Sequence, residues 1–527
     1  MPVNVTALIY VLAIVVPMFW LAKPIALKFS SERDFNRRRN VWLILTVIGF
    51  LSPSFWLFAL LAIPLLIAAA RKDTNPVALY LLLLAVIPPV SADIPAIGIA
   101  HLFELDNYRL LAFCVLLPLA VRQWRSKQAA AAPIGFDALD ILLLAYGTLT
   151  VVLYVPFELN HVLLSDSFTN ALRRAFLFFI DIYILYFAVS RTCSSRGAIV
   201  EALAAFCLAC ALLAPMAVFE MMKKWSLYMA LEAHWSDDPL YWWLHTLYRG
   251  TELRARVSAG HALVLGYLLA VGFGFWLYLK SRVASARTRV AGVALYWAGL
   301  FAAYSRGPWI GAASIAIVFA ALGQRAFSRL LKAGALMAIA FGALLASPLG
   351  ERVIDVLPAM GGSVDAENIT YRQRLADRSW ELISEHPFFG DQLALQKMGD
   401  LRQGQGIIDI VNTYAGVALH YGLIGLFVFL AFILTAAFRA YGLARRAAQA
   451  DPDLALLGTS LIACIVGTLV MIAGCSFIFA YEKMYYVLGG LAAAYARLVP
   501  ASQLQPAVAV ELGLHAESAV VSRSENK

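Results

Sequence analysis

Charged residues are scarce in this chain of 527 residues, where Asp, Glu, Lys and Arg together make up 14%. Hydrophobic residues make up 61%, which is more apolar surface than a soluble protein of this length needs. Acidic residues are fewer than basic ones, with 33 Asp and Glu against 42 Lys and Arg. The positive-inside rule predicts such an excess of basic residues for a membrane protein. No basic stripe interleaved with aromatic residues occurs, so nucleic acid is not an expected partner. The composition predicts an all-α polytopic protein of the lipid bilayer.

Cysteine is also rare, with six in the chain. Cys207 and Cys210 have a CxxC-like spacing, but no histidine or acidic residue stands beside them. We therefore expect neither a metal nor a cofactor and interpret all six as small core residues (Cys114, Cys193, Cys207, Cys210, Cys464 and Cys475). The first apolar run lacks the basic start and the cleavage site of a signal peptide, so we expect a retained span.

Basic clusters between the apolar runs predict the topology. If every cluster faces the cytoplasm, one alternation fits nearly the whole chain, with about 12–15 transmembrane helices. The apolar runs lie near 5–27, 41–70, 76–90, 108–121, 137–155, 175–190, 199–219, 261–279, 290–304, 308–324, 333–348, 413–438, 454–474 and 484–499. The external loops are then 91–107, 156–174, 220–260, 349–412 and 475–483.

The chain divides into four parts on this basis. Residues 1–200 form an N-terminal transmembrane bundle, and residues 201–440 form a core that includes the external loops 220–260 and 349–412. Residues 441–499 are C-terminal transmembrane helices, and residues 500–527 form a flexible cytoplasmic tail.

The apolar stretch 41–70 has basic flanks at both ends, so both ends should lie on the same side of the membrane. Thirty residues of helix are about 45 Å long, against about 30 Å of hydrocarbon. Pro53 follows Ser52 near the middle. We predict a hairpin of two short helices broken at residues 51–53, and whether it is re-entrant stays open.

Residues 290–324 also have basic flanks, and only Ser305-Arg306-Gly307-Pro308 has the chemistry of a turn. Gly307 permits the bend, Pro308 suits the first turn of the next helix, and Ser305 can cap that helix. Arg306 then lies at the outer face of the membrane. A helix N-terminus beside an arginine is a candidate anion site, and the alternative is an arginine that snorkels to the interface.

The two large external loops hold further candidates. Arg249, Arg254 and Arg256 precede a span that opens at Gly260-His261. Lys and Arg are disfavoured in short translocated loops, although long loops escape that bias, so we suspect that these arginines have a function. The apolar residues of 370–385 have a helical period and predict an amphipathic helix over the site, capped by Thr370 and ended by His386-Pro387. The four apolar positions are Tyr371, Leu375, Leu382 and Ile383.

The chain then returns to the bilayer. Asp409 and Asn412 stand at this return, and His420 lies about two turns deeper, where we interpret it as a core histidine. Gly422 and Gly425 predict close helix packing. On the amphipathic helix, Arg378 can pair with Glu381 or Glu385. The preceding Arg372 has no acidic partner at that spacing.

Three motifs resemble one family. SRGPWIG at 305–311 resembles the SRG-type motif of the O-antigen ligase and Wzy-type polysaccharide polymerase superfamily. RVSAGHALVLG at 256–266 is similar to the stretch that supplies an earlier functional arginine there. YRQRLADRSWELISEHPFFG, followed by VNTYAGVALHYGLIG, resembles the family's large periplasmic loop and its return to the membrane. The likeness covers roughly residues 200 to 440.

The resemblance implies a GT-C-like glycosyltransferase of the bacterial inner membrane with periplasmic loops. Such enzymes take a glycan from undecaprenyl diphosphate and transfer it to an acceptor hydroxyl, without a metal or a nucleotide sugar. Ligases pass the glycan to lipid A core, and polymerases pass it to another lipid-linked repeat unit, with a flippase and a chain-length regulator as implied partners. Ligases usually carry a histidine at the position of Val411, so the sequence favours a polymerase of exopolysaccharide or O-antigen.

The departing diphosphate needs fixed cations, and arginine binds phosphate oxygens bidentately. Arg306 and Arg256 are the candidate clamp, with Asp409 as the candidate base and Asn412 positioning the sugar. The candidate substrate-binding residues are Arg254, Arg372, Ser305 and His261. A rival class is a transporter or lipid flippase, which should show internal repeats and acidic residues near mid-membrane. We find no repeat, and acids within spans, such as Asp181, are few.

Overall fold

The computed structural model describes residues 3–97, 101–129, 136–161, 167–235, 248–249, 251–323, 366–402, 408–475 and 479–498, with scattered positions between 328 and 346. Several expectations fall largely outside these residues. They are the span 333–348, the middle of the loop 220–260, the first part of the loop 349–412 and the tail 500–527.

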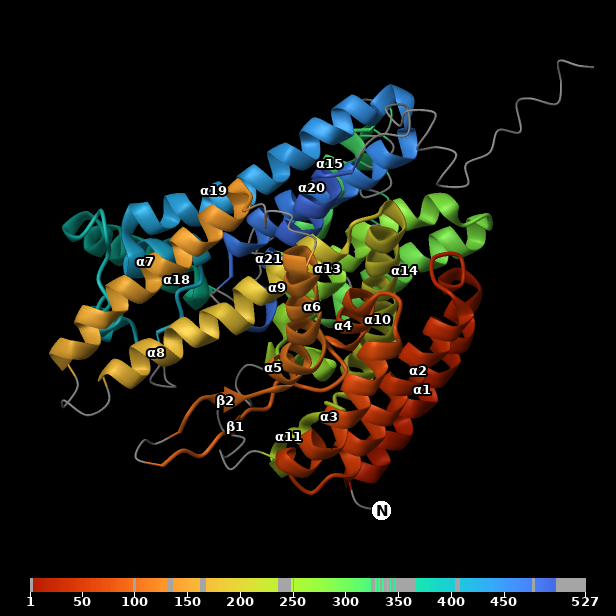
Figure 1. The fold of residues 1–527 in the computed structure, drawn as a ribbon, viewed down its shortest axis with the longest axis horizontal. Coiled ribbons are helices and arrows are strands. Elements are labelled where there is room, and N and C mark those ends of the chain that lie inside the picture. Colours follow the sequence, from red (N-terminus) through yellow and green to blue (C-terminus); the bar gives the residue numbers. More distant parts are fainter. Residues whose placement is uncertain are drawn as a thin grey trace, which may run out of the picture.

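The described chain is a bundle of helices, which confirms the all-α polytopic prediction (Figure 1). Seven helices are long and apolar enough to cross a membrane. They are α1 (Val3–Ala26), α3 (Phe55–Lys72), α7 (Ala138–His161), α10 (Arg196–Lys223), α13 (Ala262–Leu279), α19 (Thr413–Ala450) and α20 (Pro452–Ile472).

The remaining helices are shorter, more polar or interrupted by π turns. They are α2 (Glu32–Leu51), α4 (Pro76–Leu83), α5 (Asn107–Leu111), α6 (Leu117–Ala129), α8 (Ser167–Phe178), α9 (Ile184–Thr192), α11 (Met229–Trp235), α14 (Ala286–Ala302), α15 (Arg306–Ala321), α18 (Ala366–Glu385) and α21 (Phe479–Ala496). The π turns η1 (Ala112–Leu116) and η2 (Phe179–Tyr183) join α5 to α6 and α8 to α9. The 3-10 turns are η3 (Val257–Ala259), η4 (Lys280–Arg282) and η6 (Gln396–Leu401).

Two short antiparallel hairpins complete the described structure. Strand β1 (Ala92–Asp93) pairs with β2 (Glu104–Leu105), and β3 (Tyr248–Arg249) pairs with β4 (Glu252–Leu253). Both hairpins fall within loops that the sequence predicts to be external.

The predicted break in 41–70 is present, but the two helices are not short. Helix α2 ends at Leu51 and α3 begins at Phe55, where the hydroxyl of Ser54 accepts a hydrogen bond from the N–H of Leu57 at 3.3 Å. The prediction missed the start of α2 at Glu32, which the hydroxyl of Ser31 caps. Helix α3 is long and apolar enough to cross a membrane. Helix α2 has 20 residues, but six of its first eight are charged, so its apolar part, residues 41–51, is about 16 Å long.

Ion pairs gather the basic loops on one face of the bundle. Arg38 pairs with Asp73 at 2.6 Å between Nη2 and Oδ1, and with Glu201 at 2.8 Å between Nη1 and Oε1. Arg196 pairs with Asp451 at 3.0 Å. These contacts join the ends of α2, α3, α10 and α19, as the single alternation of the sequence predicts.

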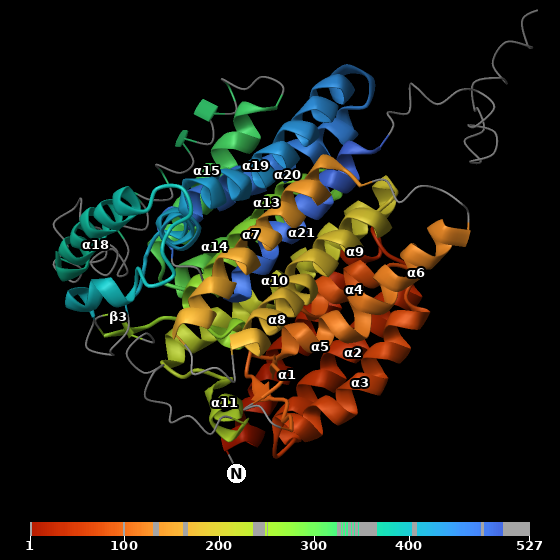
Figure 2. The same cartoon turned by 60° about the vertical axis from the view of Figure 1, so that its left-hand side comes forward.

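The large loops gather at the other end of the helices. In Figure 2, α11, β3 and α18 lie along one side of the bundle, at the left and lower left. Trp235, the last residue of α11, donates from Nε1 to the carbonyl of Ser52 in the turn between α2 and α3. Arg173, in the middle of α8, donates from Nε to the carbonyl of Leu102 in the β1–β2 hairpin at 2.7 Å.

Helix α19 is broken at Gly422, and a loop after α18 is hydrogen-bonded into the break. Gly422 has φ 66° and ψ −173°, a conformation that is essentially restricted to glycine. The freed N–H of Leu423 donates to the carbonyl of Pro387 at 2.7 Å, and the carbonyl of Leu419 accepts from the N–H of Asp391 at 2.7 Å. The close packing predicted at Gly422 is therefore a backbone-to-backbone contact with this loop.

Helix α18 covers the first half of α19 through the apolar positions that the sequence predicts. Leu375, Leu382 and Ile383 are buried against Ala418 and Leu419. The predicted end at His386-Pro387 is confirmed, but the predicted cap at Thr370 is wrong, because α18 begins one turn earlier at Ala366. The ion pair between Arg378 and Glu381 is present.

We expect Gly422→Ala to lower the stability of the protein. A Cβ at this position would lie 2.2 Å from the carbonyl oxygen of Phe388, and the strained backbone alone costs about 1–3 kcal/mol. Gly442→Ala is the matched control, because a Cβ there meets nothing within 4 Å and helix propensity favours alanine by about 0.5–1 kcal/mol. Thermal unfolding in detergent should show a lower midpoint for the first variant alone, and equal midpoints would contradict the broken helix.

Candidate active site

The segment that carries Arg254 lies directly against the predicted turn before α15. The N–H of Ala255 donates to the carbonyl of Ala302, the last residue of α14, at 3.0 Å. The guanidinium of Arg254 donates from Nη2 to the hydroxyl of Ser305 at 2.8 Å. Two arginine-bearing segments that are about fifty residues apart in the sequence are therefore adjacent in the structure.

Strained backbone surrounds this junction. The described non-glycine residues with positive φ are Lys224, Val257 and Tyr304, at 51°, 48° and 46°. Lys224 donates from Nζ to the carbonyl of Thr251, and the carbonyl of Tyr304 accepts from Nη1 of Arg249. Such conformations cost about 1–3 kcal/mol each and cluster at functional sites. Their position around one junction marks it as a candidate site.

Arg256 is buried, with 3% of its surface exposed, and its charge is matched by acidic side chains. Its guanidinium pairs with the carboxylate of Glu232 on α11 and donates from Nη1 to the carbonyl of Gly260 at 3.2 Å. The carboxylate of Glu220 accepts from the N–H groups of Arg256 and Val257, both at 3.0 Å. These bonds fix the segment that presents Arg254.

Glu220 and Glu232 are site residues that the sequence analysis missed. Glu220 lies in the last turn of α10, and Glu232 lies in α11, within the predicted external loop 220–260. The available signal was the excess of arginines just above the span, since buried arginines need acidic partners. The partners lie 24 and 36 residues away along the chain, so spacing within one helix could not identify them.

The turn at 305–308 is confirmed, and Arg306 is the first residue of α15. Ser305 occupies the cap position, but the predicted side-chain cap is not formed. Its hydroxyl donates instead to the carbonyl of Ala303 at 3.0 Å and accepts from Arg254. Ser305 therefore links the arginine segment to the turn.

The N-termini of α15 and α19 meet at Cys475. A Cβ on Gly307 would lie 3.6 Å from Sγ of Cys475, and the hydroxyl of Thr413 donates to the carbonyl of Cys475 at 3.0 Å. Both helices thus direct the positive ends of their dipoles to one region, which attracts anions.

Close packing of α13 against α15 holds this arrangement. A Cβ on Gly266 of α13 would lie 2.6 Å from the ring of Pro308, so only glycine allows the two helices to approach this closely. The motif residues Gly266 and Pro308 are therefore in contact.

A cavity of about 340 Å³ lies between α18 and the start of α19. Arg372, Val411 and Asn412 are among the residues that line it. Asn412 also caps α19, because its Oδ1 accepts from the N–H groups of Tyr414 and Ala415 at 2.9 and 3.2 Å. The structure therefore brings Arg372 and Asn412 together at one of the two converging helix N-termini.

Asp409 directly precedes Ile410, which lines this cavity. Its backbone N–H donates to the hydroxyl of Tyr371 on α18 at 3.2 Å, and its carbonyl accepts from the same hydroxyl at 3.3 Å. Asp409 is thereby tied to α18 near Arg372.

The two histidines considered in the sequence analysis both have structural bonds. His261 caps α13, with Nδ1 accepting from the N–H of Leu263 at 3.1 Å. Burial, with added repulsion from Arg254 and Arg256, lowers the pKa of His261 to about 3, so its imidazole is neutral. His420 bonds through Nδ1 with the carbonyl of Gly416 at 2.9 Å, which fits its interpretation as a core histidine.

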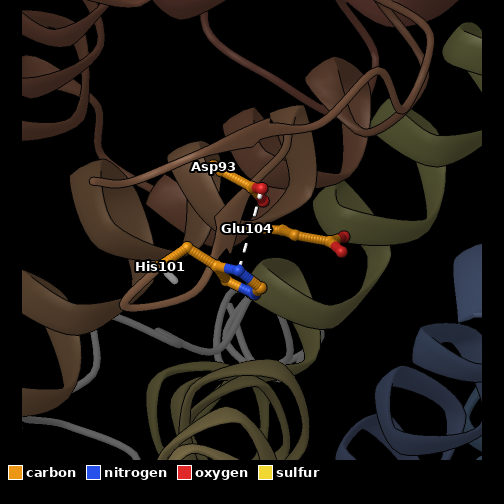
Figure 3. Close-up of side chains that lie close together, drawn as sticks. All are labelled: Asp93, His101 and Glu104. Atoms are coloured by element: carbon orange, nitrogen blue, oxygen red, sulfur yellow. Dashed lines mark ion pairs between the residues drawn. The ribbon is translucent and has the colours of Figure 1, made fainter. Parts of the chain in front are cut away.

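The cysteines are buried core residues with free thiols, as predicted. The described residues contain one group with the donor atoms of a metal site, Asp93, His101 and Glu104 on the β1–β2 hairpin. Figure 3 shows Asp93 and His101 facing each other, with Nδ1 and Oδ2 3.8 Å apart, and Glu104 beside them. Both carboxylates are exposed, which is ordinary for a charged loop surface, and the group lies in a different loop from the arginine junction.

These features define a polytopic helical membrane protein with an arginine-rich site at the end opposite its basic loops. Residues 291–430 match the family model described as O-Antigen ligase. The matched region includes the turn before α15, helix α18 and the broken part of α19. This part of the chain is therefore similar to the O-antigen ligase family, which confirms the resemblance there and supports a membrane enzyme that processes glycans. No curated protein matches the chain.

We expect the stability of the protein to depend on the protonation of Glu232. Burial raises the pKa of Glu232 to about 7, although the neighbouring Arg256 acts in the opposite direction. Because the pKa of an unfolded glutamate is about 4.3, protonation of Glu232 stabilises the fold fully below that pH, and this stabilisation is lost as the pH rises through about 7.

The measurement is the thermal midpoint of the wild type relative to Glu232→Gln, which stays neutral at every pH. The thermal midpoint of the wild type should rise relative to that of the variant as the pH falls from about 8 to about 5. Glu381→Gln, on the exposed side of α18, is the control for the change in charge. If the midpoint of the wild type instead falls relative to that of the variant as the pH falls, the pKa of Glu232 is lowered in the folded protein.

Proposed function

We propose that this protein is a glycosyltransferase that polymerises undecaprenyl-diphosphate-linked oligosaccharide repeat units on the periplasmic side of the bacterial inner membrane. The product would be an exopolysaccharide or O-antigen. The observation that carries the proposal is the junction of Arg254 with the Ser305-Arg306 turn, at the point where α15 and α19 direct their N-termini together. The region similar to the O-antigen ligase family contains that turn.

Arg254 and Arg306 would bind the diphosphate of the donor. Negative charge develops on this diphosphate as the glycosidic bond breaks, and fixed cations lower the barrier by meeting it. Guanidinium groups are suited to this because they stay charged and bind phosphate oxygens in pairs. The N-termini of α15 and α19 would add the attraction of their free N–H groups.

Arg256 would act as a positioning residue. Its guanidinium is occupied by Glu232, and its backbone is held by Glu220. The same contacts orient the segment from Glu252 to Gly260, and this segment holds Arg254 against Ser305. Loss of the Arg256 guanidinium would leave the carboxylate of Glu232 buried without its partner, which is strongly destabilising.

The acceptor would react beside Asn412. An acceptor hydroxyl oxygen attacks the anomeric carbon of the donor sugar, and the bond from that carbon to the diphosphate oxygen breaks. The electron pair leaves with the diphosphate, and the hydroxyl proton passes to the carboxylate of Asp409. Asn412 and Arg372, which line the same cavity, would orient the sugar, and the attack would invert the anomeric configuration.

A ligase is the second candidate function. The family match itself suggests it, because the family model is described as O-Antigen ligase. Val411 favours a polymerase, since it lines the cavity beside Asn412 at the position where ligases usually carry histidine. Its side chain can neither accept nor donate a proton.

We expect the arginine junction to face the outside of the cell. Thr251 is exposed in the turn between β3 and β4, Arg445 is exposed near the opposite end of α19, and the native cysteines are buried. In intact spheroplasts, Thr251→Cys should react with an impermeant maleimide, and Arg445→Cys should react only after the membrane is opened. The reverse pattern would place the site in the cytoplasm. Ser305 is unsuitable for labelling, because 1% of its surface is exposed.

We expect Arg306→Ala to reduce polymerisation by about 10²–10³-fold, the loss typical of removing one group that stabilises the charge of the transition state. Arg306→Lys should retain part of the activity, because it keeps the charge but not the paired geometry. The assay supplies purified protein in lipid nanodiscs with lipid-linked repeat units and measures chain length and released lipid diphosphate. Arg445→Ala, on the opposite face, is the control.

Two outcomes of this assay would change the proposal. Full activity of Arg306→Ala at an equal amount of folded protein would remove Arg306 from the mechanism. Transfer that occurs only when lipid A core is added would assign the protein as a ligase instead of a polymerase.

A further inference from the structure

A second, larger cavity of about 590 Å³ lies between α7, α8, α19 and α21. Its volume is within the range of ligand sites, about 300–1,000 Å³. None of the residues proposed above for the donor or for catalysis lines it. The charged side chains that do so are Arg109, Arg173, Arg174, Asp181, Glu482 and Lys483.

A buried ion-pair network forms the floor of this cavity. The carboxylate of Asp181 pairs with Nη2 of Arg109 at 3.0 Å and with Nζ of Lys483 at 2.8 Å. All three residues are at most 6% exposed. Ionisable groups at membrane depth are costly and usually mark a functional site. The network brings together three helices that are far apart in the sequence.

Two π turns lie beside the same network. Asp181 is within η2, and Arg109 lies in α5, which leads directly into η1. Single π turns inside α-helices occur frequently at functional sites. They reorient side chains relative to a regular helix, and here they accompany the two charges that meet across the cavity floor.

Two further arginines of α8 add positive charge, and neither forms an ion pair with a described carboxylate, although Glu482 lies near enough to Arg174 to interact with it. Arg173 donates to the carbonyls of His101 and Leu102 and to the side chain of Asn170. Arg174 donates to the hydroxyl of Tyr421 and lies 4.3 Å from the ring centre of Tyr154. Among the lining residues, four cations therefore face two carboxylates, and the excess favours an anionic ligand.

The remaining walls suit a sugar next to that anion. Tyr146, Tyr154 and Tyr421 present aromatic rings and hydroxyl groups, and Thr150 and Asn170 add polar atoms. Aromatic faces with hydrogen-bonding edges match the mixed apolar and polar surface of a carbohydrate ring.

The position of the cavity favours a lipid as the source of the anion. Its walls α7 and α8 expose apolar side chains on their outer surfaces, including Val152 at 57% and Leu172 at 60%. In a bilayer these surfaces contact acyl chains. A headgroup can therefore enter from the side while its hydrocarbon tail stays in the membrane.

We propose that this cavity binds the diphosphate and first sugar of a second lipid-linked glycan, the acceptor of the polymerisation. The inference rests on the proposed function. Helix α19 connects the two sites, since Tyr421 lines this cavity and Asn412 lines the other. Nine residues of helix separate them by about 14 Å, so a short repeat unit anchored at Tyr421 reaches Asn412 with its far hydroxyl.

The test counts bound lipids by native mass spectrometry of the full chain in detergent. The probe is a polyprenyl diphosphate that carries one hexose, and inorganic pyrophosphate is the lipid-free comparison. The wild type should bind two lipids, whereas pyrophosphate should not be retained. The double variant Arg173→Gln, Arg174→Gln should bind one lipid, Arg306→Ala should bind one, and the combination should bind none. Arg445→Gln is the control for charge.

The outcomes separate this inference from the proposed function. If the double variant still binds two lipids, or if it binds one but polymerises as fast as the wild type, the second site is wrong while the proposed function stands. If the wild type binds no lipid, both fail. A photoreactive group on the first sugar supplies a test on the unaltered chain, because crosslinks should fall within residues 146–154 or 170–182. Their absence from both segments would overturn the inference.

Discussion

The hydrogen bonds between the segment around Arg254 and the turn before α15 are the constraint on which the site depends. The bonds from Ala255 to Ala302 and from Arg254 to Ser305 join two arginine-bearing segments that are about fifty residues apart in the sequence. The strained φ values of Val257 and Tyr304 are maintained because Glu220 and Arg249 bond to the adjacent backbone. Preorganised charge of this kind is what a departing diphosphate requires.

Helix α19 organises the rest of the proposed chemistry. Its N-terminus meets that of α15 at Cys475 and lines the smaller cavity, and Tyr421, directly before its break, lines the larger one. The loop after α18 fills the break at Gly422 with backbone hydrogen bonds, so backbone groups freed by the break have partners within the chain, as a membrane protein requires. A broken helix is also a feature of transporters, but here the break is closed by a loop of the same chain.

Local chemistry made part of this structure predictable. Gly307 and Pro308 identify the turn before α15, Ser52 and Pro53 identify the break between α2 and α3, and the period of Leu375 and its neighbours identifies the buried side of α18. Each of these signals lies within a few residues of the feature that it predicts. The exact beginnings of α2 and α18 were missed, because helix starts depend on caps that the apolar pattern does not contain.

The long-range charge pairing could not be predicted. Arg256 finds its partner Glu232 in another helix, and Asp181 finds Arg109 and Lys483 at separations of 72 and 302 residues. Sequence spacing identifies partners only along one helix, so each of these side chains looked isolated. From the sequence, Asp181 was one of the few acidic residues within a span that a transporter could use. The structure places it in an ion-pair network on the floor of a cavity.

A structure of the protein with bound polyprenyl diphosphate would test the central claim most directly. The account predicts phosphate density in contact with the guanidinium groups of Arg254 and Arg306, beside the N-termini of α15 and α19. Phosphates bound among the basic loops at the other end of the bundle, or absent from both arginines while the lipid is present elsewhere, would contradict it.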